Sequence, residues 1–187
     1  GNSLLDLVVF GRATGMFIQE DIKSGGGVQP ADKDDIDNAL LRLNTLNNSE
    51  SGYETAEVKK ELQQCMQNYF GVFRRGEFMK KGLDELQEIR EKVDQLHLKD
   101  KSNAFNTSRV EAIELQNLFE VAEATAIAAY SRDESRGAHA RDDFPDRDDE
   151  KWLCHSLYDP LSKSVSKRDV NFSPSEVEAF PPIVRTY

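Results

Sequence analysis

The hydrophobic positions follow a helical spacing over most of the 187 residues. Apolar residues recur three and four positions apart in several long stretches, which predicts amphipathic helices. We expect helices at about residues 3–19, 31–47, 54–73, 77–96 and 107–131. The polar and glycine-rich segments between them, such as Ser24–Gly27 and Asn47–Gly52, predict loops. The predicted fold class is therefore mainly α.

The first predicted helix is apolar on almost every side. Ser3 is a suitable N-cap, and Asp6 can return the hydrogen bond as in a capping box. A helix that is apolar all round is typical of a protein core, so we expect this N-terminal helix to be buried. Because it opens the chain, we also expect the chain to be the C-terminal part of a larger protein. The apolar residues are Leu4, Leu5, Leu7, Val8, Val9 and Phe10.

The amino end of this helix has two open interpretations. The first amide groups of a helix have no partner within it and carry a partial positive charge, which favours anions. Gly1, just before the helix, would let a ligand approach the backbone closely. The stretch is therefore either a capped core helix or a helix whose amino end faces a ligand.

The helices at 54–73, 77–96 and 107–131 predict an antiparallel three-helix bundle. The middle one has a narrow apolar stripe between charged faces, which is typical of a bundle seam. The last one is apolar on more than one face, which favours a central position. The inward positions of the first are Val58, Leu62, Cys65, Met66, Tyr69, Phe70 and Phe73, and those of the second are Leu83, Leu86, Ile89, Val93 and Leu96.

After residue 131 the helical period ends. Residues 132–149 alternate arginine and acid, which indicates either a solvated loop or a loop clamped by bidentate Arg–carboxylate pairs against a neighbouring domain. Residues 152–158 and 166–172 predict a short β-hairpin with a turn at Asp159-Pro160. The proline-rich tail at 180–187 should be extended. We thus expect three parts: a truncated domain end (1–30), the helical bundle (31–131) and an irregular C-terminal cap (132–187).

Composition excludes several functions. The net charge of −10 argues against nucleic acid or an anionic membrane as a direct partner. No apolar run is long enough to insert into a membrane. Cys65 and Cys154 are expected to be free thiols. The three histidines, His97, His139 and His155, do not stand at metal-ligand spacing with these cysteines, so no metal site is predicted.

Several blocks, in this order and spacing, resemble the C-terminal part of the succinate dehydrogenase/fumarate reductase flavoprotein family. Fumarate reductases and L-aspartate oxidase share the block Glu-Ser-Arg-Gly-x-His, whereas Trp-Leu-Cys-His-Ser-Leu and the Arg-Thr-Tyr end resemble the succinate dehydrogenase flavoprotein subunits more. The blocks are Gly1–Asp6 with Phe10–Arg12, Phe70–Arg74, Arg109–Ala112 with Glu114–Leu118, Glu134–His139, Phe144-Pro145 with Arg147–Asp149, Trp152–Leu157, and Phe180–Pro182 with Arg185–Tyr187.

The resemblance implies specific site residues. Members of the family bind FAD, and Ser3 and Leu4 match the positions that contact the pyrimidine end of the flavin. The catalytic and substrate-binding residues of the family lie upstream, so none is assigned here. Arg136 and His139 are expected to pin the C-terminal region onto the flavin domain. Cys154 and His155 are expected to be packing residues.

The resemblance also implies a function for the intact protein. It would oxidise succinate, a dicarboxylate, to fumarate and pass electrons through FAD and an iron–sulfur subunit to quinone. It would be bound through membrane anchor subunits to the cytoplasmic face of a bacterial inner membrane. The 187 residues alone should be inactive and bind FAD weakly, and the first helix could pair with a second copy. The alternatives are a fumarate reductase or L-aspartate oxidase, or a stand-alone helical interaction module.

Overall fold

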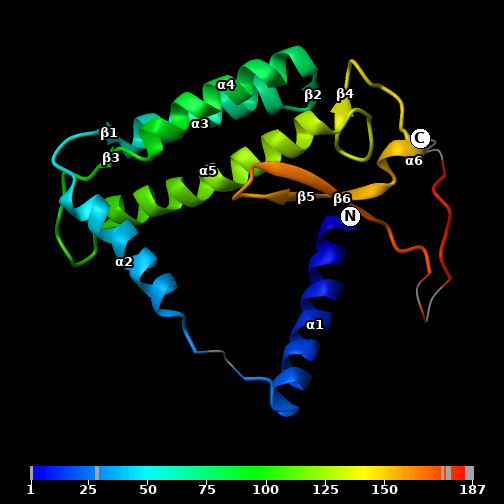
Figure 1. Cartoon of the computed structure of the whole chain (residues 1–187), viewed down its shortest axis with the longest axis horizontal. Helices are drawn as coiled ribbons and strands as arrows, with labels where there is room; N and C mark the ends of the chain where they lie inside the picture. The colour runs from blue at the N-terminus through cyan, green and yellow to red at the C-terminus, as the bar shows by residue number, and fades with distance from the viewer. Residues whose placement is uncertain (1, 28–29, 174, 176–177, 184–187) are drawn as a thin grey trace. The chain divides into compact units, whose positions relative to one another are not determined.

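The computed structural model describes residues 2–27, 30–173, 175 and 178–183, with only the backbone for residues 2 and 3. The chain divides into two compact units, Gly1–Asn44 and Thr45–Tyr187, which are described separately. The described residues are mainly helical, as predicted, with short strands in the second unit (Figure 1). None of the described helices is both long and apolar enough to cross a membrane.

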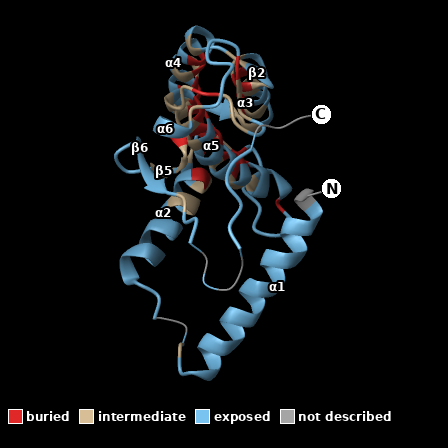
Figure 2. Ribbon diagram, turned by 90° about the vertical axis from the view of Figure 1, so that its right-hand side faces the viewer, coloured by how far each residue is buried: buried red, intermediate tan, exposed pale blue. Residues whose placement is uncertain are grey.

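Helix α1 (Asn2–Lys23) is longer than predicted. It already includes Asn2, so Ser3 lies inside the helix and is not its N-cap, and Gly1 is outside the described residues. The predicted burial is not found within the described chain, because residues 4–23 of α1 are exposed (Figure 2). Leu4, for example, is 72% exposed. The apolar side chains of α1 would be buried only if neighbouring groups covered them, and the described residues do not supply such groups.

Helix α2 (Lys33–Asn48) begins as the sequence predicts. The Asp32 carboxylate accepts a hydrogen bond from the amide of Asp34 at 2.7 Å, which satisfies one of the unpaired donors of the first turn. Its last turn belongs to the second unit, where Leu46 is fully buried. The apolar residues Ile36 and Leu40, earlier in the same helix, are exposed.

Helices α3 (Thr55–Phe70), α4 (Gly76–Val93) and α5 (Thr107–Ser131) form the predicted bundle (Figure 1). Helix α5 has the predicted bounds, and Asn106 caps it by accepting the Arg109 amide at 2.9 Å. The buried side chains gather between these helices (Figure 2). The core includes Val58, Leu62, Cys65, Phe70, Met79, Leu86, Ile89, Val93, Leu96, Leu115 and Phe119.

One predicted core residue, Phe73, is 77% exposed, which corrects the predicted end of α3. The helix stops at Phe70, and Gly71 leaves the helical conformation. The chain then forms strand β2 (Phe73–Arg74), which pairs in parallel with β4 (Ala140–Arg141). At the opposite end of the bundle, β1 (Tyr53–Glu54) pairs in parallel with β3 (Leu96–His97). The sequence did not predict these two-residue strands, because two residues are too few to show the alternation of apolar and polar positions that marks a strand.

The C-terminal region contains the predicted hairpin with shifted bounds. Strands β5 (Cys154–Asp159) and β6 (Ser164–Asp169) are antiparallel. Trp152, expected in the first strand, instead ends the short helix α6 (Asp149–Trp152), which Asp148 caps. Glu123 of α5 holds the hairpin, accepting from Lys163 Nζ at 2.9 Å. Residues 178–183 form no helix or strand, and residues 184–187 of the predicted extended tail are outside the described part.

Candidate functional site: the arginine–carboxylate cluster and the start of α1

The charged loop 132–149 is organised around one carboxylate, Glu134, whose side chain has no exposed surface. It accepts hydrogen bonds from Arg132 Nη1 at 2.5 Å and from Arg136 Nε at 2.8 Å. The amide of Asp148, fourteen residues further on, donates to it at 2.9 Å. Both ends of the loop therefore meet at a single buried group.

The environment keeps Glu134 ionised. Burial by itself would raise the pKa of this carboxyl. The hydrogen bonds from Arg136, the Asp148 amide and Arg132 outweigh burial, so the pKa lies below its ordinary value. A charged carboxylate is therefore the stable form at neutral pH, and it compensates two partly buried guanidinium groups.

A second pair attaches the loop to the bundle. Arg141, which is almost fully buried, binds Asp143 through two parallel hydrogen bonds of 2.7 and 2.8 Å. Asp143 also accepts the Gly76 amide at the start of α4, at 2.8 Å. The guanidinium and the amide hold the pKa of Asp143 well below its ordinary value. The pair thus links strand β4 to the amino end of α4.

His139 connects the same loop to strand β2. Its Nε2 lies 3.1 Å from the carbonyl oxygen of Arg132, which can only accept, so the ring proton is assigned to Nε2. Nδ1 then accepts from Arg74 Nη1 at 2.8 Å. Burial, chiefly, and the guanidinium groups of Arg74, Arg141 and Arg132 lower the pKa of His139. The imidazole is therefore neutral at pH 7.

The backbone around His139 is a tight turn. The amides and carbonyls of Arg136 and His139 bond to each other at 2.8 and 3.0 Å, and Gly137 adopts φ +59° between them. This left-handed conformation favours glycine. The charged segment is therefore a loop fixed by Arg–carboxylate pairs, as one of the two interpretations predicted. The groups that fix it belong to the loop itself and to the bundle, and attachment to a neighbouring domain stays a prediction. Contacts of Arg136 and His139 with a flavin domain stay a prediction.

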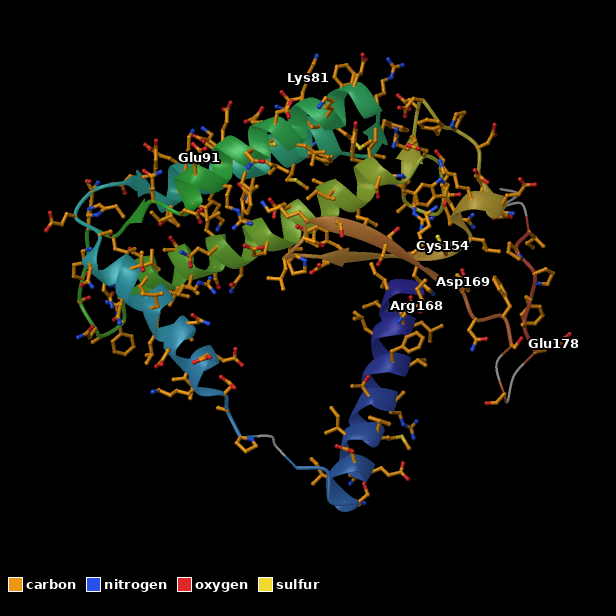
Figure 3. All side chains as sticks on the ribbon, in the orientation of Figure 1. Lys81, Glu91, Cys154, Arg168, Asp169 and Glu178 are labelled. Atoms are coloured by element: carbon orange, nitrogen blue, oxygen red, sulfur yellow. The ribbon has the colours of Figure 1, made fainter. Side chains whose placement is uncertain are left out.

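Cys154 and His155 lie at the start of β5, next to this cluster. Cys154 is partly buried and is paired with Asp169 of β6, at the same end of the hairpin (Figure 3). The backbone carbonyl of Cys154 accepts from Arg132 Nη2 at 2.7 Å. His155 is exposed and is paired with Arg168. Among the described residues no group of three or more histidine, cysteine or acidic side chains is placed to hold a metal ion.

The two predicted flavin contacts lie in the first turn of α1. The Ser3 backbone is helical, but its side chain is outside the described part; the Leu4 side chain is exposed. No acidic residue stands in this first turn, so no side chain of the turn itself neutralises the partial positive charge of its amides. Contact of Ser3 and Leu4 with a flavin stays a prediction.

Several residues of the cluster were not singled out from the sequence. Arg74 appeared only as the last residue of the block Phe70–Arg74, and Arg141 and Asp143 as members of a charged run. The available signal was the alternation of arginine and acid in 132–149, which favoured bidentate pairs without identifying the partners. Pairing of β2 with β4, 66 residues apart along the chain, is what brings Arg74 to His139.

Comparison with known proteins gives consistent results over the whole chain. The family described as fumarate reductase flavoprotein C-term matches residues 59–187. The succinate dehydrogenase flavoprotein subunit of Coxiella burnetii is 43% identical over 181 residues, which cover 97% of this chain. An E. coli quinol fumarate reductase FrdA variant has a similar structure, with a TM-score of 0.82, 32% identity and 97% coverage. The Mycobacterium smegmatis Sdh1 complex matches 91% of the chain with a TM-score of 0.73 and 30% identity.

The matched proteins are much longer than this chain. The chain spans 31% of the Coxiella burnetii protein, 31% of the E. coli chain and 29% of the M. smegmatis chain. The similarity therefore covers nearly all of this chain but only about a third of each longer protein.

Proposed function

Because the chain belongs to the succinate dehydrogenase/fumarate reductase flavoprotein family, we propose that it is the C-terminal part of the FAD-containing subunit of a succinate dehydrogenase. The observation that carries this proposal is the 43% identity to a succinate dehydrogenase flavoprotein over 97% of the chain. The intact subunit would remove a hydride and a proton from succinate to give fumarate. Electrons would then pass through iron–sulfur clusters to quinone.

In this proposal, the start of α1 is the part of the chain closest to the chemistry. FAD, when bound, would supply the acceptor for the hydride. The amides of the first turn, near Ser3, would donate toward the pyrimidine end of the ring, where negative charge accumulates on reduction. The side chain of Leu4 would pack against the ring. Both residues are cofactor-binding in this proposal, and neither is catalytic.

The remaining parts of the chain would have supporting roles. The bundle would brace the flavin domain and face an iron–sulfur subunit, and through it the membrane anchor subunits. The protein would then be peripheral, on the cytoplasmic face of a bacterial inner membrane. The arginine–carboxylate cluster would keep the C-terminal region in one conformation for these contacts.

The experiment that tests the reaction uses the full-length protein assembled with its partner subunits. Succinate with an artificial electron acceptor, fumarate with a reduced viologen, and aspartate with oxygen are assayed in parallel. We expect succinate oxidation to be the fastest. Faster fumarate reduction would assign the protein to the fumarate reductases, and aspartate oxidation to the L-aspartate oxidases.

The isolated 187 residues are expected to bind FAD weakly and to be inactive, because α1 would supply only one edge of a flavin site. The purified chain is mixed with FAD, and the flavin absorption and fluorescence are recorded. A tight, stoichiometric change in the spectrum would contradict this expectation. The alternative of a stand-alone interaction module is tested by reading the gene upstream of Gly1, where the proposal requires an open frame with a glycine-rich βαβ region.

A further inference from the structure

Arg74 of strand β2 differs from the other arginines of the cluster. Its Nε donates to the carbonyl oxygens of Phe70 and Gly71, at 3.3 and 3.0 Å, and its Nη1 donates to His139 Nδ1. Within the described part of the chain no carboxylate oxygen lies within 4.0 Å of its guanidinium nitrogens, whereas Arg132, Arg136 and Arg141 each pair with at least one carboxylate. Arg74 thus carries a positive charge without a matching anion.

No acidic side chain of the described residues compensates this charge. The partner His139 is a neutral acceptor, because its proton is on Nε2 and points to the Arg132 carbonyl. Burial, and then the nearby Arg141, lower the pKa of Arg74, which means that its surroundings disfavour the cation. A partly buried cation bonded only to neutral groups is costly, and an anion beside it would remove the cost.

A cavity of about 430 Å³ opens next to Arg74. It is formed by β2, the last turns of α5, the loop and the start of β5. Its described lining contains no acidic residue, unlike the cavities lined by Glu57, Glu61 and Glu85 or by Glu77 and Asp143. The polar and cationic lining is Arg74, Thr125, Arg132, Arg136, His139, Cys154, His155 and Ser156.

The chemistry of this lining selects the kind of anion. Arg132 and Arg136 are already compensated by Glu134 and Asp149, so one positive charge, that of Arg74, is in excess. A monoanionic carboxylate matches one guanidinium in charge and in fork geometry. Ala128 and Ala129 add an apolar wall that suits a short aliphatic stem. The Ser156 hydroxyl, which accepts from Arg132 Nη2 at 3.1 Å, can turn its hydrogen toward a second oxygen.

We propose that this cavity is a carboxylate-binding site in which Arg74 is the anchoring cation. Its ligand is a carboxylate on a short aliphatic stem, either a free small acid or an acidic side chain of another segment of the intact protein. The site lies wholly in the second unit and includes none of the residues proposed to contact the flavin.

The first experiment measures binding by the 187-residue chain. The chain, labelled with ¹⁵N-arginine, is titrated with acetate at pH 7 and constant ionic strength, with chloride as the reference anion. We expect the Arg74 Nε–H resonance to shift saturably with acetate and the resonance of Arg141, paired with Asp143, to stay in place. A linear response, or equal shifts at both arginines, overturns the proposal, and this reading does not depend on any variant folding.

Variants then locate the site. We expect Arg74→Gln to weaken acetate binding by about tenfold or more, since a charge-assisted hydrogen bond is lost. Arg75→Gln is the matched control, because Arg75 is the next residue, is half exposed and does not line the cavity. It should bind acetate as the unchanged chain does. Equal binding by Arg74→Gln and the unchanged chain overturns the proposal.

A second arm distinguishes the sources of the carboxylate, and this arm alone rests on the proposed function, because it uses the full-length subunit. If the same acetate titration shifts Arg74 in the full-length subunit, the ligand is a free acid. If it does not, and the Arg74 resonance of the full-length subunit without acetate already lies where acetate saturation places it in the 187-residue chain, an acidic side chain of the subunit occupies the cavity; an unresponsive resonance at the acetate-free position overturns the proposal for the intact subunit. The first two results support a carboxylate site, and none of the three involves FAD or turnover.

Discussion

At Glu134, two guanidinium groups and a backbone amide share one fully buried carboxylate. Buried charges are tolerated only when they are paired and hydrogen-bonded. Here both oxygens of the Glu134 carboxylate accept hydrogen bonds. Because the Asp148 amide is one of them, the interaction also closes the loop between residues 134 and 148. A single side chain therefore determines the path of a segment that has no helix or sheet of its own over most of its length.

Replacing Glu134 by glutamine should destabilise the second unit strongly. The substitution keeps the size but removes the negative charge, leaving Arg132 and Arg136 partly uncompensated inside the protein. We expect the free energy of unfolding to fall by about 3–5 kcal/mol, measured by urea denaturation with the fluorescence of the single tryptophan, Trp152. The control is Asp149→Asn, at a carboxylate that is 38% exposed, which should cost less. Equal losses in the two variants would contradict the central role of Glu134.

His139 should make stability depend on pH in the mildly acidic range. Its pKa in the folded chain is lowered, so the unfolded chain takes up a proton first as the pH falls below about 6.5. The contribution of His139 to the free energy of unfolding is therefore fully present above that pH. It is lost as the pH falls toward the pKa of the folded chain, by at most about 1.4 kcal/mol per pH unit. His139→Gln should flatten the decline measured by urea denaturation between pH 6.5 and 5. The exposed His155→Gln should retain it, and an unchanged slope in His139→Gln would argue against this assignment.

Between elements, α3 and α4 pack closely at Gly82. A methyl group added there would lie 2.5 Å from Tyr69 Cβ and 2.6 Å from Phe70 Cε2, both on α3. Cys65 Sγ lies 3.5 Å from the Gly82 carbonyl oxygen at the same contact. Glycine in the middle of a helix is unfavourable by itself, so the reason for it is the distance between the two helices.

Gly82→Ala should push α3 and α4 apart. We expect a loss of about 1–3 kcal/mol in the free energy of unfolding, because a well-packed core tolerates an extra methyl group poorly. The matched control is Gly15→Ala in α1, where a methyl group would have no neighbour within 4 Å among the described residues. That variant should not reduce the stability reported by Trp152. A Gly82→Ala chain as stable as the unchanged one would show that the helices adjust without cost.

For the molecule as a whole, the exposed apolar surface of α1 is the dominant feature of the first unit. Leu4, Leu5, Leu7, Val8 and Phe10 are all more than 60% exposed, and contiguous apolar surface of this kind promotes association. Burial of α1, which its apolar pattern predicts, therefore requires another protein surface that covers this helix. In the proposed enzyme the flavin domain would supply it.

The isolated 187 residues are thus expected to self-associate through α1. Light scattering over a range of concentrations should show dimers or larger species that dissociate on dilution. Val8→Glu, in the middle of the apolar surface, should shift the equilibrium toward monomers, whereas Gln19→Glu on the same helix should not. A monomer at high concentration in the unchanged chain would contradict this prediction.

Much of the second unit could be read from local pattern. The period of apolar residues placed α3, α4 and α5 and most of their core, and alternation placed the hairpin near its observed position. The errors, at Phe73, Leu96 and Trp152, occurred at element ends. There the chain leaves the helix to make a long-range pair, or enters a four-residue helix too short to show a period.

The sequence by itself determined the mainly α fold, the bundle and its apolar faces, and the motifs that place the chain in its family, because these depend on residues close together along the chain. Only the tertiary structure decided which charges meet. Pairing of β2 with β4 sets Arg74 beside His139, and the buried Glu134 gathers Arg132, Arg136 and the Asp148 amide. A run of alternating arginine and acidic residues allows many ion pairs, and the sequence does not distinguish among them. The fold decides which carboxylates are buried, and the observed pairing is the one in which the buried carboxylate has its hydrogen-bond donors.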